Sequence, residues 1–158
     1  MNKPELLQQI IARLSRDLEV LFTAAKTAHE AATHEENLPD NKYDTLALEA
    51  SYVAQGQANR AQEIRHSIEA YRQLSLEEGG DAVRLTSLVV IEADDGTRKT
   101  VFIGPREGGL KITVGQTEIM VITPASPLGR ELLGKMLGDT AEIGAGSGQC
   151  VYEIVAIV

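Results

Sequence analysis

Four carboxylates crowd into one short stretch of the sequence, EENLPDNKYD, at residues 35–44. They are Glu35, Glu36, Asp40 and Asp44, and the amide of Asn37 stands among them. Carboxylate oxygens are ligands that a hard cation such as Mg²⁺ prefers, so these acids are candidate metal ligands. Alternatively, Asn37 or Asp40 caps a helix that has Pro39 in its first turn. Spacing alone leaves both interpretations open.

Other residues that could carry chemistry lack suitable partners in the sequence. His29, His34 and His66 have no Cys or His at ligand spacing, so we expect solvent-facing helix residues rather than a zinc site. Cys150 is the one cysteine, which excludes an internal disulfide, and with no basic neighbour it predicts a buried, inert thiol in a strand. Ser126 precedes a proline and is interpreted as a helix cap rather than a nucleophile.

Two long helices must position the acidic stretch. Apolar residues alternate spacings of four and three on both sides of it, which is the pattern of a coiled-coil seam. The first set is Leu7, Ile11, Leu14, Leu18, Leu21, Ala25, Ala28 and Ala32, and the second is Ala47, Ala50, Ala54, Gln57, Ala61, Ile64, Ile68 and Tyr71. Pairing them antiparallel places bulky residues near the termini and alanines near the bend. The sequence therefore predicts a thin-tipped helical finger, although a plain oligomerisation coil is the simpler alternative.

Composition limits the classes of partner. The 158 residues carry a formal charge of −8, which opposes non-specific binding to free DNA, and aromatic residues make up only 4%. The 43% hydrophobic content is enough for a core filled by Leu, Ile, Val and Ala. No run of about 18 apolar residues and no apolar leader is present, so we expect a soluble, cytoplasmic protein without membrane contact.

The second half of the chain has the short, β-branched runs of a sheet. A hairpin is predicted where the turn DDG separates VRLTSLVVIEA from TRKTVFIG, and another strand region follows in LKITVGQTEIMVIT. SPLGRELLGK predicts a short helix with Pro127 at its first position. GSG at 146–148 lacks the Lys-Ser/Thr of a phosphate loop, so we expect a hairpin turn. Glu77-Glu78-Gly79-Gly80 marks the change, which predicts domains at 1–78 and 79–158.

At this point the motifs carry a resemblance. ITPASPLGRELLGKMLGDTAEI followed by YEIVAIV resembles the closing segment of the bacterial Gre transcript-cleavage factors (GreA/GreB), and LTSLVVIEADDGTRKTVFIGP resembles the strands that open that domain. The resemblance covers nearly the whole chain, since the family also begins with a helical finger. It implies an α+β fold: an N-terminal antiparallel coiled-coil hairpin and a C-terminal FKBP-like antiparallel sheet with one short helix.

The same resemblance implies RNA polymerase as the partner. The globular domain would dock on the polymerase while the finger enters its secondary channel, near the 3′ end of nascent RNA. Acids at the tip, here Asp40 and Glu36, would share Mg²⁺ with the polymerase active site, which itself hydrolyses backtracked RNA. The resemblance thus implies that no cofactor is bound tightly and that the factor is not an enzyme. The family's tip motif, Asp-Leu-x-Glu-Asn, falls on residues 37–41 here, where Asn37 replaces Asp and Asp40 replaces Glu.

These departures define an alternative function, a secondary-channel regulator of polymerase without cleavage. FKBP-like folds also include prolyl isomerases, but those need several aromatic side chains around a proline ring, and the globular half offers Phe102 and Tyr152. A third alternative is a coiled-coil adaptor with no affinity for polymerase. Arg13, Arg16, Arg60 and Arg65 could gather midway along the finger; with acids interspersed, we expect a solvated mixed-charge face.

A polymerase-docking surface is predicted around the Ser-Pro turn. Its residues are Ser126, Pro127, Leu128 and Arg130. A capped turn is rigid, and it would present an apolar side chain beside a cation, a combination favoured at interfaces. The alternative is that the turn only ends a strand and starts a helix.

Overall fold

The chain divides into two compact units. The computed structural model describes residues 2–36, 41–144 and 146–158, with side chains described outside 25, 28, 29, 31–36 and 41–54. Met1–Ile10 and Ala70–Val158 form one unit, here called the globular unit, and Ile11–Glu69 form the other, the helical unit. This division lies inside both long helices, because the first residues of α1 and the last of α2 belong to the globular unit. The predicted domain boundary at 78/79 stays a prediction.

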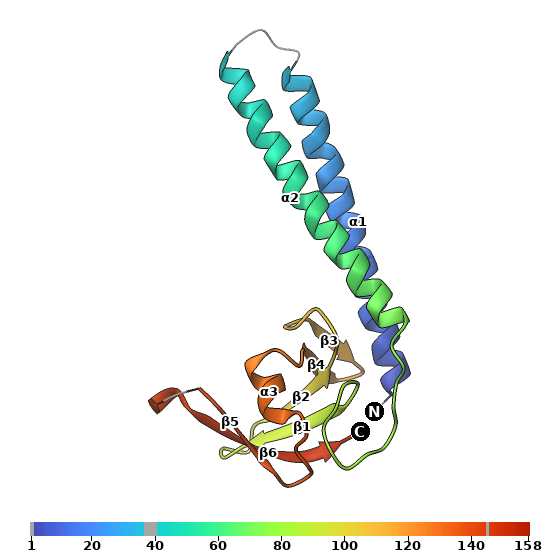
Figure 1. The fold of residues 1–158 in the computed structure, drawn as a ribbon, viewed down its shortest axis with the longest axis vertical. Coiled ribbons are helices and arrows are strands. Elements are labelled where there is room, and N and C mark those ends of the chain that lie inside the picture. The colour runs from blue at the N-terminus through green and yellow to red at the C-terminus, as the bar shows by residue number, and fades with distance from the viewer. Residues whose placement is uncertain (1, 37–40, 145) are drawn as a thin grey trace. The chain divides into compact units, whose positions relative to one another are not determined.

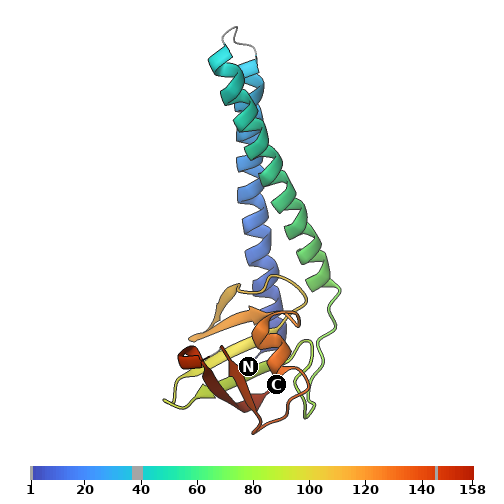
Figure 2. The same ribbon diagram turned by 60° about the vertical axis from the view of Figure 1, so that its left-hand side comes forward.

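Two long helices make the hairpin that the apolar spacing predicts. α1 spans Lys3–Glu36 and α2 spans Asn41–Arg72. They run antiparallel and side by side in both views of the molecule (Figures 1 and 2). On α2, four of the predicted seam residues with described side chains are buried: Ala61, Ile64, Ile68 and Tyr71. The coiled-coil interpretation of this helix is confirmed.

The seam on α1 is shifted by one residue at its start. Leu6 and Ile10 are buried, whereas the predicted Leu7 and Ile11 are half-buried. Both positions of each doublet are apolar, so spacing alone does not distinguish them. Residues 1–10 belong to the globular unit, and the packing there selects Leu6 and Ile10. Farther along, Leu14 is buried as predicted.

Six strands form one sheet in the globular unit. They are β1 (Leu88–Ala93), β2 (Arg98–Ile103), β3 (Lys111–Val114), β4 (Thr117–Ile122), β5 (Thr140–Ile143) and β6 (Cys150–Ile157), in the order β3-β4-β2-β1-β6-β5. The predicted hairpin pairs β1 with β2, and GSG becomes a short 3₁₀ turn, η1 (Gly146–Gly148), between β5 and β6. β2 and β4 are parallel, so the sheet is mixed rather than wholly antiparallel. The reason is that β3 takes the outer edge and turns the chain back.

A short helix covers one face of this sheet. α3 spans Pro127–Leu132, and its Leu132 lies in a core with Ile91, Val101, Ile103 and Ile154, all of them fully buried. Figure 2 shows α3 (orange) against the sheet. The arrangement fits the predicted α+β, FKBP-like fold. Among the described helices, none is long and apolar enough to cross a membrane.

The prediction of a buried Cys150 is wrong, because the thiol is exposed. Cys150 is the first residue of β6 and pairs with Ile143 of β5. β1 pairs with β6 only from Tyr152 onward, so the hairpin's end extends past the strand that would cover Cys150. Alternation along the strand therefore placed its side chain on the right face but beyond the core.

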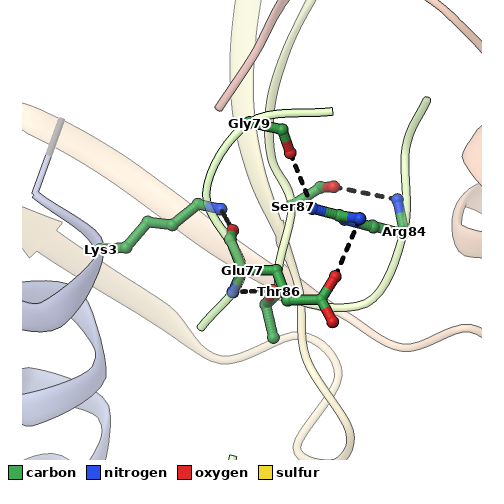
Figure 3. A network of polar contacts seen from close by, with 6 residues as sticks. All are labelled: Lys3, Glu77, Gly79, Arg84, Thr86 and Ser87. Atoms are coloured by element: carbon green, nitrogen blue, oxygen red, sulfur yellow. Dashed lines mark hydrogen bonds and ion pairs between the residues drawn. The ribbon is translucent and has the colours of Figure 1, made fainter. Parts of the chain in front are cut away.

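A polar network fixes the segment that follows α2 to the start of α1 (Figure 3). Lys3 is 3% exposed, and its ammonium donates to the carbonyl of Glu77 at 2.7 Å. Arg84 pairs with the Glu77 carboxylate at 2.9 Å and also donates to the carbonyl of Gly79. Burial lowers the pKa of the Lys3 ammonium, and the positive charge of Arg84 lowers it further. All of these contacts lie within the globular unit.

Candidate functional site

The acidic stretch joins the two long helices. The sequence predicts that this stretch is the turn, but Glu35 and Glu36 end α1 and Asp44 lies in the first turn of α2, so the helices extend into it from both sides. Asn37 and Asp40 lie outside the described residues, as do the side chains of the other three acids. The predictions of a helix cap and of Mg²⁺ ligands at this position therefore stay predictions.

Elsewhere, the described residues contain no group of three His, Cys, Asp or Glu side chains placed to hold a metal ion. His66, the one histidine whose side chain is described, is exposed on α2 as predicted. The carboxylates at residues 35–44 stay the metal ligands predicted from the sequence, since their oxygen donors suit a hard cation.

The arginines along the helical hairpin form a mixed-charge face. Arg13 pairs with Asp17 at 3.4 Å, and Arg60 pairs with Glu63 at 3.2 Å, each within its own helix. The side chains involved are 41–60% exposed, and exposed pairs of this kind contribute little to stability. The prediction of interspersed charges is confirmed for these two arginines.

One arginine of the helical unit crosses to the other helix. The Arg65 guanidinium lies over the ring of Phe22, 5.8 Å from its centroid. Helical side chains lean toward the N-terminus of their own helix, so in an antiparallel pair these two side chains lean toward each other. Phe22 remains 56% exposed even so. The contact links α1 and α2 without burying the ring.

The Ser-Pro turn of the globular unit is built as predicted. The Ser126 hydroxyl accepts from the Gly129 amide at 3.1 Å and donates to the Thr123 carbonyl at 2.7 Å. Pro127 occupies the first position of α3, where a missing N–H costs nothing. One side chain thus holds both the end of the preceding loop and the first turn of the helix.

A close backbone approach makes this turn specific for glycine. Gly129 is buried, and a methyl group at its Cβ position would overlap the carbonyl oxygen of Thr123. Only a residue without a side chain lets α3 start this close to the preceding loop. The structural role of the turn is therefore real, whether or not the turn also binds a partner.

The four predicted docking residues differ in exposure. Pro127 and Arg130 are exposed, but Leu128 is half-buried and packs against the core of the sheet. The expectation that Leu128 is exposed at an interface is wrong. In the short helix α3, Leu128 faces the sheet together with Leu132. No ion pair in the described part of the chain involves Arg130, which leaves its guanidinium available to a partner.

Edge strand β5 adds residues that the sequence did not indicate. Pro127 and Arg130 line a hollow of about 310 Å³ together with Glu131 of α3 and Glu142 and Ile143 of β5. Both acids are engaged: Glu131 lies 3.7 Å from the Lys135 ammonium, and Glu142 accepts from Gln149 at 2.8 Å. The packing of α3 on β5 is a long-range contact, and no local pattern predicts it.

The two aromatics considered for an isomerase pocket lie on opposite faces of the sheet. Tyr152 belongs to the core that α3 covers, with Val101 and Ile103. Phe102 lies between those two residues along β2, so its side chain points to the other face. They cannot line one proline-sized pocket.

Known proteins are similar in sequence to this chain over nearly its whole length. The model of the family described as transcription elongation factor, GreA/GreB, C-term, matches residues 78–158. The transcription elongation factor GreA of Mesorhizobium japonicum is 30% identical over 99% of this chain and 98% of its own length. The transcription inhibitor protein Gfh1 of Thermus thermophilus is also 30% identical, over 95% of this chain and 91% of its own. The crystal structure of Thermus aquaticus Gfh1 is 27% identical and covers 92% of both chains, with a TM-score of 0.40.

Proposed function

Because this chain belongs to the GreA/GreB family of transcription elongation factors, we propose that it acts on RNA polymerase by placing its helical hairpin in the secondary channel. There it stimulates cleavage of backtracked RNA by the polymerase's own active site. Factors of this family are not themselves enzymes. The observation that carries the proposal is the acid-rich stretch between α1 and α2, in a chain whose relatives match from end to end.

The two units take different parts in this proposal. The globular unit docks, and its exposed contacts are the Pro127 ring and the Arg130 guanidinium beside the hollow on β5. Ser126 and Gly129 position these two residues through the capped turn. Leu128 supports the surface from below. A rigid turn loses little entropy on binding, which favours it as an anchor.

The tip carries the chemistry. Asp40 and Glu36 would supply oxygen ligands to an Mg²⁺ ion shared with the polymerase, with Glu35 and Asp44 adding negative charge nearby. Such an ion stabilises the attacking and leaving oxygens when RNA is hydrolysed. The 3′ end of the nascent RNA is then the group that the tip approaches.

Asn37 supports a second candidate, a channel-binding regulator without cleavage. An amide is a weaker metal ligand than a carboxylate and cannot act as a base. The chain is 30% identical both to an elongation factor and to a transcription inhibitor, so overall identity does not separate the two activities. The difference must come from a few residues, and the tip is where the two candidates diverge.

RNA cleavage in stalled elongation complexes tests the proposal. Wild-type protein should shorten the RNA, and Asp40→Asn should reduce the cleavage rate at least tenfold without weakening polymerase binding. Asn37→Asp should raise the rate, because it adds a charged ligand. A helix cap would not distinguish these variants, since Asn and Asp cap equally well.

A matched control is Glu30→Gln, which removes an exposed carboxylate of α1 that lies outside the acidic stretch. It should leave cleavage unchanged. Polymerase binding by all variants with no RNA fragment at any Mg²⁺ concentration would reject cleavage and leave the regulator. Absence of polymerase binding would reject both and leave the adaptor.

A further inference from the structure

A second hollow opens on the sheet, on the face that α3 partly covers. Its volume is about 480 Å³, within the range of pockets that hold a ligand or several side chains. Its lining includes Arg98, Lys99, Val101, Lys111, Glu118 and Met120. Val101 and Lys111 are both ladder partners of Met120, which places these three on one face of neighbouring strands. We call this hollow the β2–β3 cleft.

Lys99 is held in place at this cleft. Its ammonium donates to the Tyr152 hydroxyl at 3.2 Å and lies 5.4 Å from the centroid of the same ring. The lysine stem reaches across β1, which lies between β2 and β6 in the sheet. Tyr152 is 8% exposed and cannot move away easily. The positive charge is therefore fixed before any ligand arrives, which lowers the entropic cost of binding.

In the part of the chain that the structure describes, the Lys99 ammonium uses only one of its donors. It carries three N–H groups, and the tyrosine hydroxyl takes one of them. The tyrosine hydroxyl carries no full negative charge, whereas the neighbouring cations Arg98 and Lys111 each lie beside a carboxylate. Arg98 is paired with Glu92 at 2.6 Å, and Lys111 lies 3.8 Å from Glu118. Of the three cations that line the cleft, Lys99 is thus the one best placed to bind the carboxylate of a partner.

Charge and shape together define the ligand. Three cations and one acid line the cleft in a chain whose net charge is −8, so this surface has the opposite sign to the molecule as a whole. Between the charges lies the partly exposed side chain of Met120, with the buried Val101 beneath it, and a flexible, polarisable thioether adapts well to varied apolar groups. The polar side chains of Gln116 and Thr117 border the opening.

We propose that the β2–β3 cleft binds a short acidic segment of a partner protein, with a carboxylate on Lys99 and an apolar side chain on Met120. A nucleic acid fits less well, because Glu118 lies inside the cleft and the net charge repels a long polyanion. This inference does not depend on the proposed action on RNA polymerase.

Fluorescence anisotropy with a defined probe tests it on the full-length protein at low salt. The probe is a fluorescein-labelled hexapeptide, Glu-Leu-Glu-Glu-Leu-Glu, and its counterpart has Gln in place of every Glu. The wild type should bind the acidic peptide and not the counterpart. Lys99→Gln should weaken binding about fivefold, the effect of losing one favourable ion pair. Glu118→Gln should strengthen binding about twofold, since it removes repulsion and frees Lys111.

The matched control is Lys26→Gln, which makes the same charge change at an exposed position on α1 and should leave binding unchanged. Lys99 is exposed, so its variant should keep the wild-type circular dichroism spectrum and melting temperature. Equal affinity of wild type and Lys99→Gln, or no binding of the acidic peptide, would overturn the proposal. So would tighter binding of a uridine hexanucleotide, or complete displacement of the peptide by millimolar phosphate.

Discussion

The two units of this protein are stabilised in different ways. In the globular unit, side chains from five strands and α3 form one continuous core, and most of its members are fully buried. In the described part of the helical unit, a narrow seam is buried, at Leu14, Ala61, Ile64 and Ile68, while Val20 and Phe22 are 69% and 56% exposed. Among the side chains that the structure describes, the buried core of the sheet is therefore broader than the buried seam of the hairpin.

The difference fits the two roles that we propose. A docking surface must keep its shape. Here the Ser126 hydroxyl binds the Gly129 amide, and the close approach of Gly129 to the Thr123 carbonyl leaves no space for a side chain. A hairpin that enters a channel has to be thin, so it cannot carry a thick apolar core. Stability is therefore concentrated in the unit that binds, and the unit that acts depends on a narrow seam.

The largest expected effect comes from truncating one core residue in each unit. Ile154→Ala should cost the sheet about 4 kcal/mol, and Ile64→Ala should cost the hairpin about 2 kcal/mol, because a seam between two helices collapses more easily into the space that the lost side-chain carbons leave. Amide hydrogen exchange, followed segment by segment, measures both. If Ile64→Ala lowered the exchange protection of the sheet as much as that of the hairpin, the two units would not be stabilised separately and the comparison would fail.

Glycine in the docking turn gives the next effect. Gly129→Ala should destabilise the globular unit by about 3 kcal/mol, since the added methyl group meets the Thr123 carbonyl and the backbone must shift. Chemical denaturation measures this loss. Gly148→Ala is the control, because nothing lies within 4 Å of its Cβ position, and it should stay within about 0.5 kcal/mol of wild type. Equal losses in the two variants would remove the close approach from the account.

These sites also show how far the sequence could lead. The capped turn, the β1–β2 hairpin and the α2 seam follow from local signals, namely Ser-Pro, DDG and apolar spacing, and all three are present. The parallel pairing of β2 with β4 and the half-buried state of Leu128 depend on packing between distant segments.

The predictions that differ from the structure also have physical explanations. Leu6 and Leu7 are interchangeable in a pattern of apolar residues, and only the packing of the globular unit selects Leu6. The strand predicted at Cys150 is present, but the lack of a basic neighbour could not show that the β5–β6 hairpin extends beyond β1 and leaves the thiol exposed. Lys99 and Tyr152 are 53 positions apart in the sequence, and their contact reaches across β1. No local motif predicts such a contact.

A smaller effect is expected at the buried lysine. Lys3→Ala should destabilise the globular unit by about 1–2 kcal/mol, because the Glu77 carbonyl loses its charged donor. Thermal unfolding followed by circular dichroism measures it. Arg13→Ala, which removes an exposed cation from the same helix, should have little effect. A Lys3 variant as stable as Arg13→Ala would show that the network of Figure 3 contributes little.

The smallest effect depends on pH. A hydrogen bond from Thr97 lowers the pKa of the Asp95 carboxyl below 3.8, and Asp95 lies fully exposed in the β1–β2 turn. A lowered pKa stabilises the folded state above the unfolded value, and this contribution disappears as pH falls through the folded value. Asp95→Asn should therefore flatten the acid limb of the stability profile slightly. An NMR titration that places the Asp95 pKa at or above 3.8 would contradict the assignment.

The division of roles between the two units is tested most directly by affinity for RNA polymerase. Surface plasmon resonance on immobilised core enzyme would compare wild type, Pro127→Ala/Arg130→Ala and Asp40→Asn. We expect the docking variant to bind about tenfold more weakly and the tip variant to bind within about twofold of wild type. Wild-type protein that does not bind, or a tip variant that loses as much affinity as the docking variant, would contradict the account.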